Sequence, residues 1–368
     1  MPDVARPTTT AEVADVMRDA AARGRTVVAR GRGTKQSWGC PVAPDLVVDL
    51  SGMDRVLDHQ AGDLVVEVQA GARLVDVQDA VGAARQRLAL DETVPGASVG
   101  GTLATNASGP SRLATGTARD LLIGVTVVRA DGVVAKAGGR VVKNVAGYEV
   151  GKLVVGSFGT LAVVTEALFR LHPEPEVRRW VSVEAGDPRR LHDLVHAVVH
   201  SQAVPGAVEV DGGTLAVLLA GRAAGVEARA RTVAELVGGT VSDTAPAGWG
   251  RYPWEPSETG LKITCVLSGL HDVLSCAADV GARVRGSAGT GVLYAALADP
   301  DAVPDALARL REVAARHGGT VVVVDAPDEV KAAVDVWGPV PALDLMRRVK
   351  DQFDPDRRLA PGRFVGGI

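Results

Sequence analysis

Cysteine is scarce in this chain, and its scarcity excludes two kinds of metal chemistry. Only three of the 368 residues are cysteines, at positions 40, 265 and 276, and none forms a C-x-x-C pair or joins closely spaced histidines. Structural zinc sites and iron–sulfur clusters require such groups of ligands. We therefore expect neither on this chain.

Aromatic residues and an excess of charge are also lacking. Aromatics make up 3% of the chain, and 40 Lys and Arg against 44 Asp and Glu give a formal net charge of -4, with no long run of either sign. Nucleic-acid-binding proteins generally carry stacking aromatic side chains or a basic surface. The composition therefore argues against a nucleic acid or other polyanion as partner.

Long apolar runs are absent as well. The N-terminal residues MPDVARPTTT lack the basic start and apolar core of a secretory signal, and no window is long enough to cross a bilayer. We expect a cytoplasmic protein that does not insert directly into a membrane. Association with a membrane is expected only at its periphery, through a partner complex.

Glycine, in contrast, is abundant and gathers in three clusters. The first is GRGTKQSWG, residues 31–39, which follows a predicted strand at residues 26–29. Gly31-x-Gly33 after a strand is reminiscent of a dinucleotide-binding fingerprint, but Gln36 occupies the position of the third glycine and no helix can open after it. We predict that successive backbone N–H groups of this loop hold an anion. A plain strand-to-strand turn is the alternative.

The other two clusters lie at residues 93–109 and 156–160. The former is rich in glycine and Ser/Thr hydroxyls, which suits a diphosphate and a ribityl chain that need short hydrogen bonds and little steric bulk. The latter, GSFGT, separates apolar runs at 153–155 and 161–165 and indicates backbone passing close to a ligand, or an ordinary hairpin turn. We take residues 139–173 as the segment around which the chain is organised.

Beyond residue 175 a pattern of strands and helices occurs twice. Strand, helix, two strands and helix are predicted in each pass, which implies an antiparallel sheet with helices on one face. The predicted strands are 179–184, 207–210, 215–219, 261–267, 283–285, 292–298 and 320–324, and the predicted helices are 189–201, 226–237, 270–280 and 304–317. A helix at 342–353 and an extended tail end the chain.

Together, the glycine clusters, the segment GRVVKNVAGYEVGKL and the tail FDPDRRLAPGRF resemble the FAD-binding family typified by vanillyl-alcohol oxidase and p-cresol methylhydroxylase. Within that family, KNVAGY before GSFGTL is most similar to the E-type, FAD-binding subunits of bacterial glycolate oxidase. The resemblance implies an α+β protein. A two-part FAD-binding domain at 1–175, with subdomains of about 1–50 and 51–175, precedes an antiparallel α+β cap domain at 176–330. Residues 331–368 return to the FAD-binding domain.

The resemblance also implies which residues bind FAD. The first glycine cluster would hold the pyrophosphate, and the second would line the diphosphate and the ribityl chain. The third would lie beside the adenine and the flavin. The implied cofactor-binding residues are Gly31, Arg32, Gly33, Thr34, Lys35, Gln36, Ser37, Pro95, Gly96, Ser98, Gly100, Gly101, Thr105, Asn106, Gly109, Gly159 and Val163. Because no histidine lies in either of the first two loops, we expect the FAD to be bound noncovalently.

The chain departs from related 2-hydroxy-acid dehydrogenases in its catalytic groups. Their His-x-Gly-Asp-Gly-Asn-x-His motif has no counterpart here, so no metal site is predicted. A helix places histidines 192, 196 and 200 on one face, which could bind metal, but we interpret it as a partly solvated face. The residues expected near the flavin are Lys143, Asn144, Tyr148, Lys152 and Arg363, and the catalytic residue among them is not determined.

Three functions follow from the resemblance. The first is the FAD-binding subunit of a glycolate oxidase complex, which oxidises glycolate to glyoxylate and passes electrons to a larger FAD-containing subunit and an iron–sulfur subunit. The second is a self-sufficient FAD-dependent dehydrogenase of a small 2-hydroxy acid such as D-lactate. The third is a flavin-binding accessory scaffold without catalysis of its own.

Overall fold

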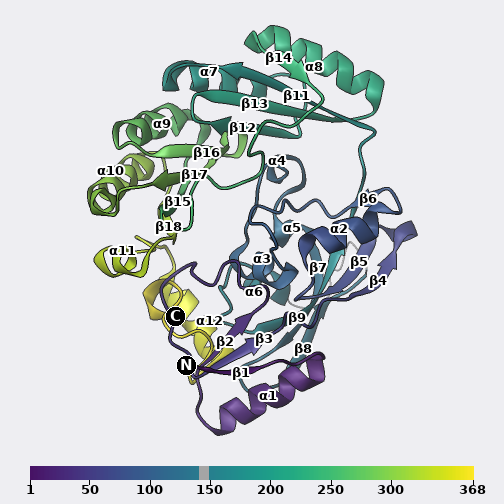
Figure 1. The fold of residues 1–368 in the computed structure, drawn as a ribbon, viewed down its shortest axis with the longest axis vertical. Coiled ribbons are helices and arrows are strands. Elements are labelled where there is room, and N and C mark those ends of the chain that lie inside the picture. The colour runs from purple at the N-terminus through teal and green to yellow at the C-terminus, as the bar shows by residue number, and fades with distance from the viewer. Residues whose placement is uncertain (141–148) are drawn as a thin grey trace. The chain divides into compact units, whose positions relative to one another are not determined.

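The computed structural model of the protein describes residues 1–140 and 149–368 (Figure 1). The chain forms two compact units. The first comprises residues 1–108, 116–173 and 340–368, and the second comprises residues 109–115 and 174–339. Each unit is therefore assembled from segments that are far apart in the sequence. In the described part of the chain, no helix combines the length and apolar character needed to cross a bilayer.

The first unit contains a parallel sheet and an antiparallel sheet. The parallel sheet has the order β1-β3-β2, and the antiparallel sheet has the order β4-β5-β9-β7-β8. A short ribbon pairs β6 with β10. The strands are β1 Asp3–Ala5, β2 Val27–Arg30, β3 Leu46–Asp49, β4 Val56–Gln60, β5 Val65–Gln69, β6 Gln86–Arg87, β7 Leu122–Val128, β8 Val134–Gly138, β9 Val163–Arg170 and β10 His172–Pro173.

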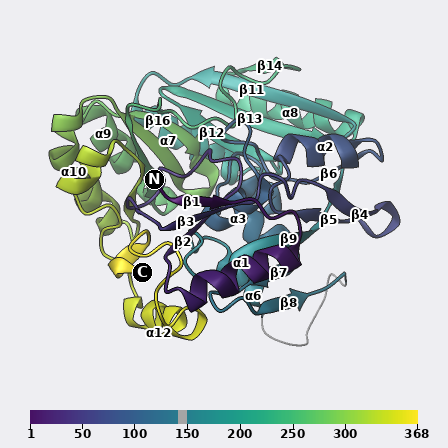
Figure 2. The same ribbon diagram turned by 60° about the horizontal axis from the view of Figure 1, so that its bottom comes forward.

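Helix α1 packs against strands of both sheets (Figure 2). Its N-cap is Thr9, whose hydroxyl accepts a hydrogen bond from the backbone N–H of Glu12 at 3.2 Å. Val13 and Met17 lie one turn apart and are fully buried in the core of this unit. The helices of this unit are α1 Thr10–Ala22, α2 Leu74–Gly82, α3 Val99–Thr105, α5 Ala118–Leu121, α6 Val150–Val154 and α12 Leu343–Phe353, with 3-10 turns η1 Ala61–Asp63 and η5 Val365–Gly367.

Two of the glycine clusters differ from their predicted form. Residues 93–109, which were treated only as a loop, contain helix α3, because Ser98 caps it and Val99 and Leu103 bury the same face. If the third cluster were a hairpin turn, the apolar run at 153–155 would be a strand. Most of this run instead belongs to helix α6. Only the run after the third cluster is extended, in β9.

The second unit is built on one antiparallel sheet of eight strands. Its order is β14-β11-β13-β12-β16-β17-β15-β18, and every pairing within it is antiparallel. Outwards from the central β12–β16 pair, one half of the sheet has the order β12-β13-β11-β14 and the other has the order β16-β17-β15-β18. The four strands of each half are thus arranged in the same way, as expected for a repeated unit. The strands are β11 Val177–Glu184, β12 Ala207–Asp211, β13 Thr214–Gly221, β14 Thr240–Ser242, β15 Thr259–Thr264, β16 Arg283–Ser287, β17 Val292–Leu297 and β18 Val321–Asp325.

Four helices cover one face of this sheet (Figure 1). They are α7 Pro188–Val199, α8 Ala223–Val237, α9 Leu270–Asp279 and α10 Val303–Arg316; shorter elements are α4 Arg112–Thr115, α11 Asp328–Ala333, η2 Leu267–Gly269, η3 Ala288–Thr290 and η4 Pro300–Ala302. The predicted α+β class, with an antiparallel sheet and helices on one face in the second part of the chain, is confirmed. Among the described residues, no group of three or more potential ligands is placed to hold a metal ion.

Candidate functional site

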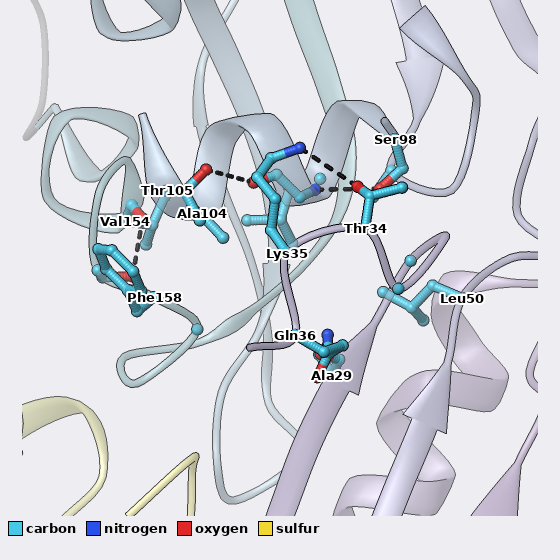
Figure 3. A pocket seen from close by; sticks show the side chains of 18 of the residues that line it. Ala29, Thr34, Lys35, Gln36, Leu50, Ser98, Ala104, Thr105, Val154 and Phe158 are labelled. Carbon is cyan, nitrogen blue, oxygen red and sulfur yellow. Dashed lines mark hydrogen bonds between the residues drawn. The ribbon is translucent and has the colours of Figure 1, made fainter. Parts of the chain in front are cut away.

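A pocket in the first unit collects residues from all three glycine clusters and from the tail (Figure 3). It encloses about 740 Å³ of space, part of which is open to solvent. The lining residues are Ala29, Gly31, Gly33, Thr34, Lys35, Gln36, Leu50, Ala70, Ser98, Gly100, Gly101, Ala104, Thr105, Val154, Ser157, Phe158, Gly159, Ala162, Val164 and Arg363.

The first loop offers its backbone amides to this pocket. The chain leaves strand β2 at Arg30 and turns at Gly33, which has φ +77°. No hydrogen bond joins the N–H groups of residues 31–35 to another described residue. Successive free amides in a turn form a nest that binds anions. The backbone N–H groups of residues 31–35 are thus available as donors to an anion in this loop.

Helix α3, in contrast, has no free amide at its N-terminus. The N–H of Val99 donates to Ala72 O at 2.9 Å, and the N–H of Gly100 donates to Ala70 O at 2.7 Å. The N–H of Gly101 donates to the hydroxyl of Ser98 at 3.2 Å. Because these donors are already used, the helix end supports the pocket wall and does not itself supply an anion site.

Two glycines allow the pocket walls to approach each other. A Cβ on Gly31 would lie 2.2 Å from the hydroxyl oxygen of Ser98, and a Cβ on Gly100 would lie 2.9 Å from the Cβ of Ala70. Neither position has room for a side chain without displacement of a neighbour. The first loop therefore lies directly against the N-cap of α3.

The third loop is fixed to the C-terminal end of α3. The N–H of Gly156 donates to Leu103 O at 2.9 Å, and the N–H of Phe158 donates to Ala104 O at 2.8 Å. Phe158 has φ +56°, a left-handed conformation that is costly for a residue with a side chain. Such strain at a pocket wall is typical of a ligand-binding site.

The C-terminal tail joins the first loop to the third. Arg363 donates to the carbonyl oxygen of Gln36 at 3.2 Å, and the N–H of Cys40 donates to Arg363 O at 3.0 Å. The ring of Phe364 stacks on that of Phe158 with centroids 5.6 Å apart. The tail thus holds two pocket loops that are more than a hundred residues apart in the sequence.

Two buried cations line the pocket. Lys35 is 7% exposed and Arg363 is 9% exposed. Burial lowers the pKa of Lys35 from 10.5 to about 8, while the negative charge of Glu92 opposes that shift. Burial also lowers the pKa of Arg363, whose Nε has no hydrogen-bond partner among the described residues. No Asp or Glu is among the lining residues.

These features fit the diphosphate of FAD. A diphosphate diester carries two negative charges and many acceptor oxygens, and the pocket presents free amides, two cations and no carboxylate. No His, Cys or Tyr occurs among the described lining residues, so the pocket wall offers no side chain of the kinds that commonly tether a flavin covalently.

The structure brings together most of the predicted cofactor-binding residues. Those lining the pocket are Gly31, Gly33, Thr34, Lys35, Gln36, Ser98, Gly100, Gly101, Thr105 and Gly159, and the predicted flavin-side residue Arg363 joins them. Those outside its lining are Arg32, Ser37, Pro95, Gly96, Asn106, Gly109 and Val163. Arg32 instead donates to Gly71 O at 3.1 Å, and Gly109 belongs to the second unit.

Three of the predicted catalytic residues, Lys143, Asn144 and Tyr148, lie outside the described residues. Lys152 is in helix α6, where its ammonium group donates to Arg119 O. The predicted set of cofactor-binding residues did not include the apolar part of the wall, formed by Leu50, Val154, Phe158, Ala162 and Val164.

Comparison with known proteins agrees with this geometry. Residues 2–138 match a protein family described as an FAD binding domain, and this range contains the first two pocket loops. The chain is 27% identical to an uncharacterised FAD-linked oxidoreductase of Mycobacterium tuberculosis, over 98% of this chain and 90% of that protein. It is 29% identical to the glycolate oxidase subunit GlcD of Bacillus subtilis, over 59% of this chain and 47% of the relative.

A shorter match involves the glycolate oxidase subunit GlcE of Escherichia coli, with 38% identity over 23% of this chain and 25% of the relative. Among solved structures, an alkyldihydroxyacetonephosphate synthase aligns with a TM-score of 0.70 at 15% identity, covering 98% of this chain and 76% of that one. At this identity the structural match shows the fold alone. The p-cresol methylhydroxylase-type fold implied by the sequence is confirmed.

Proposed function

We propose that this chain, an FAD-dependent oxidoreductase with an FAD binding domain at residues 2–138, oxidises a small 2-hydroxy acid to the 2-oxo acid as the FAD-binding subunit of a glycolate oxidase-type complex. The observation that supports FAD binding is the pocket, which presents free amides and two cations and has no carboxylate in its lining. The similarity to two glycolate oxidase subunits supports the substrate class.

When bound, FAD supplies the acceptor for the two electrons that leave the substrate with its α-hydrogen. The chain supplies binding and orientation. Amides 31–35 and the cations Lys35 and Arg363 hold the cofactor, and Phe158 with its neighbours gives an apolar wall that excludes water. Oxidation of glycolate to glyoxylate would deliver the α-hydrogen with its electron pair to the bound flavin and the hydroxyl proton to a base.

The electron path to other subunits is the second part of the proposal. The chain has too few closely spaced cysteines to hold an iron–sulfur cluster, so electrons would leave through a larger FAD-containing subunit and an iron–sulfur subunit. We place this complex in the cytoplasm, with any membrane contact made by a partner.

A self-sufficient dehydrogenase is the second candidate. It is favoured by the full-length similarity to the Mycobacterium tuberculosis FAD-linked oxidoreductase, which spans 98% of this chain. In that case substrate alone would reduce the flavin, and no partner chain would be needed for turnover.

The test is anaerobic mixing of glycolate, D-lactate or D-2-hydroxyglutarate with the purified chain and, separately, with the complex that copurifies with the tagged chain from its native host. We expect glycolate to bleach the flavin absorption rapidly in the complex and slowly in the chain alone. Rapid bleaching of the chain alone would favour the self-sufficient enzyme. If no 2-hydroxy acid bleaches either sample, the proposed substrate class is wrong.

A further inference from the structure

We propose that the side chain of Lys35 is a proton-linked anchor for the FAD diphosphate, so that cofactor binding takes up a proton at this residue. The inference depends on FAD binding and not on which acid is oxidised. Its failure would therefore be distinct from a failure of the proposed substrate class.

The ammonium group of Lys35 is buried in the pocket without a strong partner. It is 7% exposed, and its only hydrogen bond within the described residues goes to the hydroxyl of Thr34 at 3.5 Å, the limit for such a bond (Figure 3). The ring centroid of Trp38 lies 5.9 Å from it, at the edge of cation–π range. An ammonium group has three protons to donate. This one therefore retains donors for a ligand.

The position of Lys35 selects the diphosphate over other parts of FAD. It is the last residue of the run 31–35 whose amides are free, so backbone donors and side-chain charge belong to one loop. Arg363, which donates to the carbonyl oxygen of Gln36, provides a second positive charge in the pocket lining. Two cations match the two charges of a diphosphate, whereas riboflavin carries no negative charge for them to neutralise.

The charged groups around Lys35 explain why its proton is loosely held before binding. Glu92 is the one carboxylate that raises its pKa, and Glu92 also accepts a hydrogen bond from the N–H of Gly96 at 3.1 Å. Arg363 faces the same pocket with the same sign of charge as Lys35. Because burial outweighs the effect of Glu92, the pKa of Lys35 falls to about 8.

The neighbouring arginines of the same segment do not compete for the ligand. Arg30 pairs with Asp49 at 2.8 Å, and Arg32 pairs with Asp54 at 3.3 Å. Their charges are compensated locally and they do not line the pocket. The excess positive charge available to an anion therefore comes from Lys35 and Arg363.

Proton linkage fixes the sign of the pH effect. A diphosphate beside Lys35 stabilises the ammonium form and raises its pKa in the complex. Below pH 7 the residue is protonated before and after binding, so affinity is insensitive to pH. As pH rises through about 8, the free protein loses this proton and binding must restore it. Affinity for FAD should then fall, by up to about tenfold per pH unit.

The direct measurement is isothermal titration calorimetry of the full-length apoprotein with FAD, in buffers of different ionisation enthalpy. At pH 8.5 we expect an uptake of about 0.7 proton per FAD bound, and at pH 6.5 an uptake near zero. Lys35→Met should remove the uptake at pH 8.5 and weaken FAD binding at pH 7 by roughly 10- to 100-fold. Lys35→Arg should retain binding and also remove the uptake, because arginine does not titrate in this range.

Titrations with ADP and riboflavin test which part of FAD interacts with Lys35, and a second lysine variant controls for effects of the substitution on folding. ADP should reproduce the uptake and riboflavin should not. Lys136→Met, a change of the same charge at a side chain that is 73% exposed, should leave both FAD affinity and uptake unchanged. Absence of uptake with the unaltered protein at pH 8.5, or full uptake in Lys35→Met, would overturn the proposal. Uptake with riboflavin equal to that with FAD would overturn its assignment to the diphosphate.

Discussion

The ammonium group of Lys350 and the carbonyl oxygen of Thr160 lie 2.7 Å apart, although 190 residues separate them in the sequence. The same ammonium donates to the carboxylate of Asp354 at 2.7 Å and to Leu359 O at 3.0 Å. Lys350 is 1% exposed and Asp354 is fully buried. One buried cation therefore connects helix α12, the third glycine cluster and the start of the tail that reaches the pocket.

Removing this cation should destabilise the first unit. Lys350→Met leaves the carboxylate of Asp354 buried without its counter-ion, and such a loss costs roughly 3–5 kcal/mol. We expect that decrease in the free energy of unfolding, measured by urea denaturation of the apoprotein. The double variant Lys350→Met/Asp354→Leu removes both charges and should recover part of the loss. A single variant as stable as the unaltered protein would contradict this role.

The aromatic contact at the end of the tail should matter more for the cofactor than for folding. Phe364→Ala removes the stacking on Phe158, and an aromatic pair contributes about 0.5–1.5 kcal/mol. We expect the Kd for FAD to rise about two- to tenfold in a flavin fluorescence titration. Phe364→Tyr retains the ring and serves as the matched control. Equal affinities of the Ala and Tyr variants would show that the stack does not shape the pocket.

The close approach of the first loop to helix α3 predicts a steric effect. Gly31→Ala places a methyl group 2.2 Å from the hydroxyl of Ser98, which must shift and release its cap on Gly101. Overpacking of this kind costs roughly 1–3 kcal/mol. We expect a lower thermal midpoint and weaker FAD binding.

The control for Gly31→Ala lies in the same unit. Gly82→Ala, at the end of helix α2, meets no atom within 4 Å and should be neutral or slightly stabilising. Adding Ser98→Gly to Gly31→Ala removes the clashing hydroxyl and should restore part of the FAD affinity. A double variant no better than Gly31→Ala alone would mean that the clash is not with Ser98.

Lys35 should affect apoprotein stability in the opposite sense to cofactor binding. Its pKa is about 8 in the folded protein against 10.5 as the reference value, so its burial as a cation costs up to about 3 kcal/mol. The cost is fully present below pH 8 and disappears as pH rises from 8 to 10.5, because the folded protein loses the proton first. Lys35→Met should therefore raise the apoprotein thermal midpoint at pH 7, and this gain should shrink toward pH 10. Calorimetric scans at both pH values measure it.

The sequence by itself determined the elements of the fold and the identity of the cofactor. The residue pattern located strand β2 and the repeated pattern of the second sheet, because these signals are local and span several residues. Helix α3 within residues 93–109 was not predicted, since seven residues rich in glycine carry little helical signal and the Ser98 cap becomes visible only when its partner is placed. The FAD assignment came from the resemblance of the glycine clusters and the tail to a known family, whereas in the structure the first cluster is the one that presents free amides to the pocket.

Only the tertiary structure decided which residues meet in the pocket. The sequence singled out Lys35 and Gln36 as part of a backbone loop, but not the burial of the Lys35 ammonium or the pairing of Gln36 with Arg363 across 327 residues. Lys350 carried no motif, and Phe364 belonged to the tail motif without any sign that its ring stacks on Phe158. Their roles arise from burial and distance, which depend on how the tail returns to the first unit, and neither quantity is encoded in a local pattern of residues.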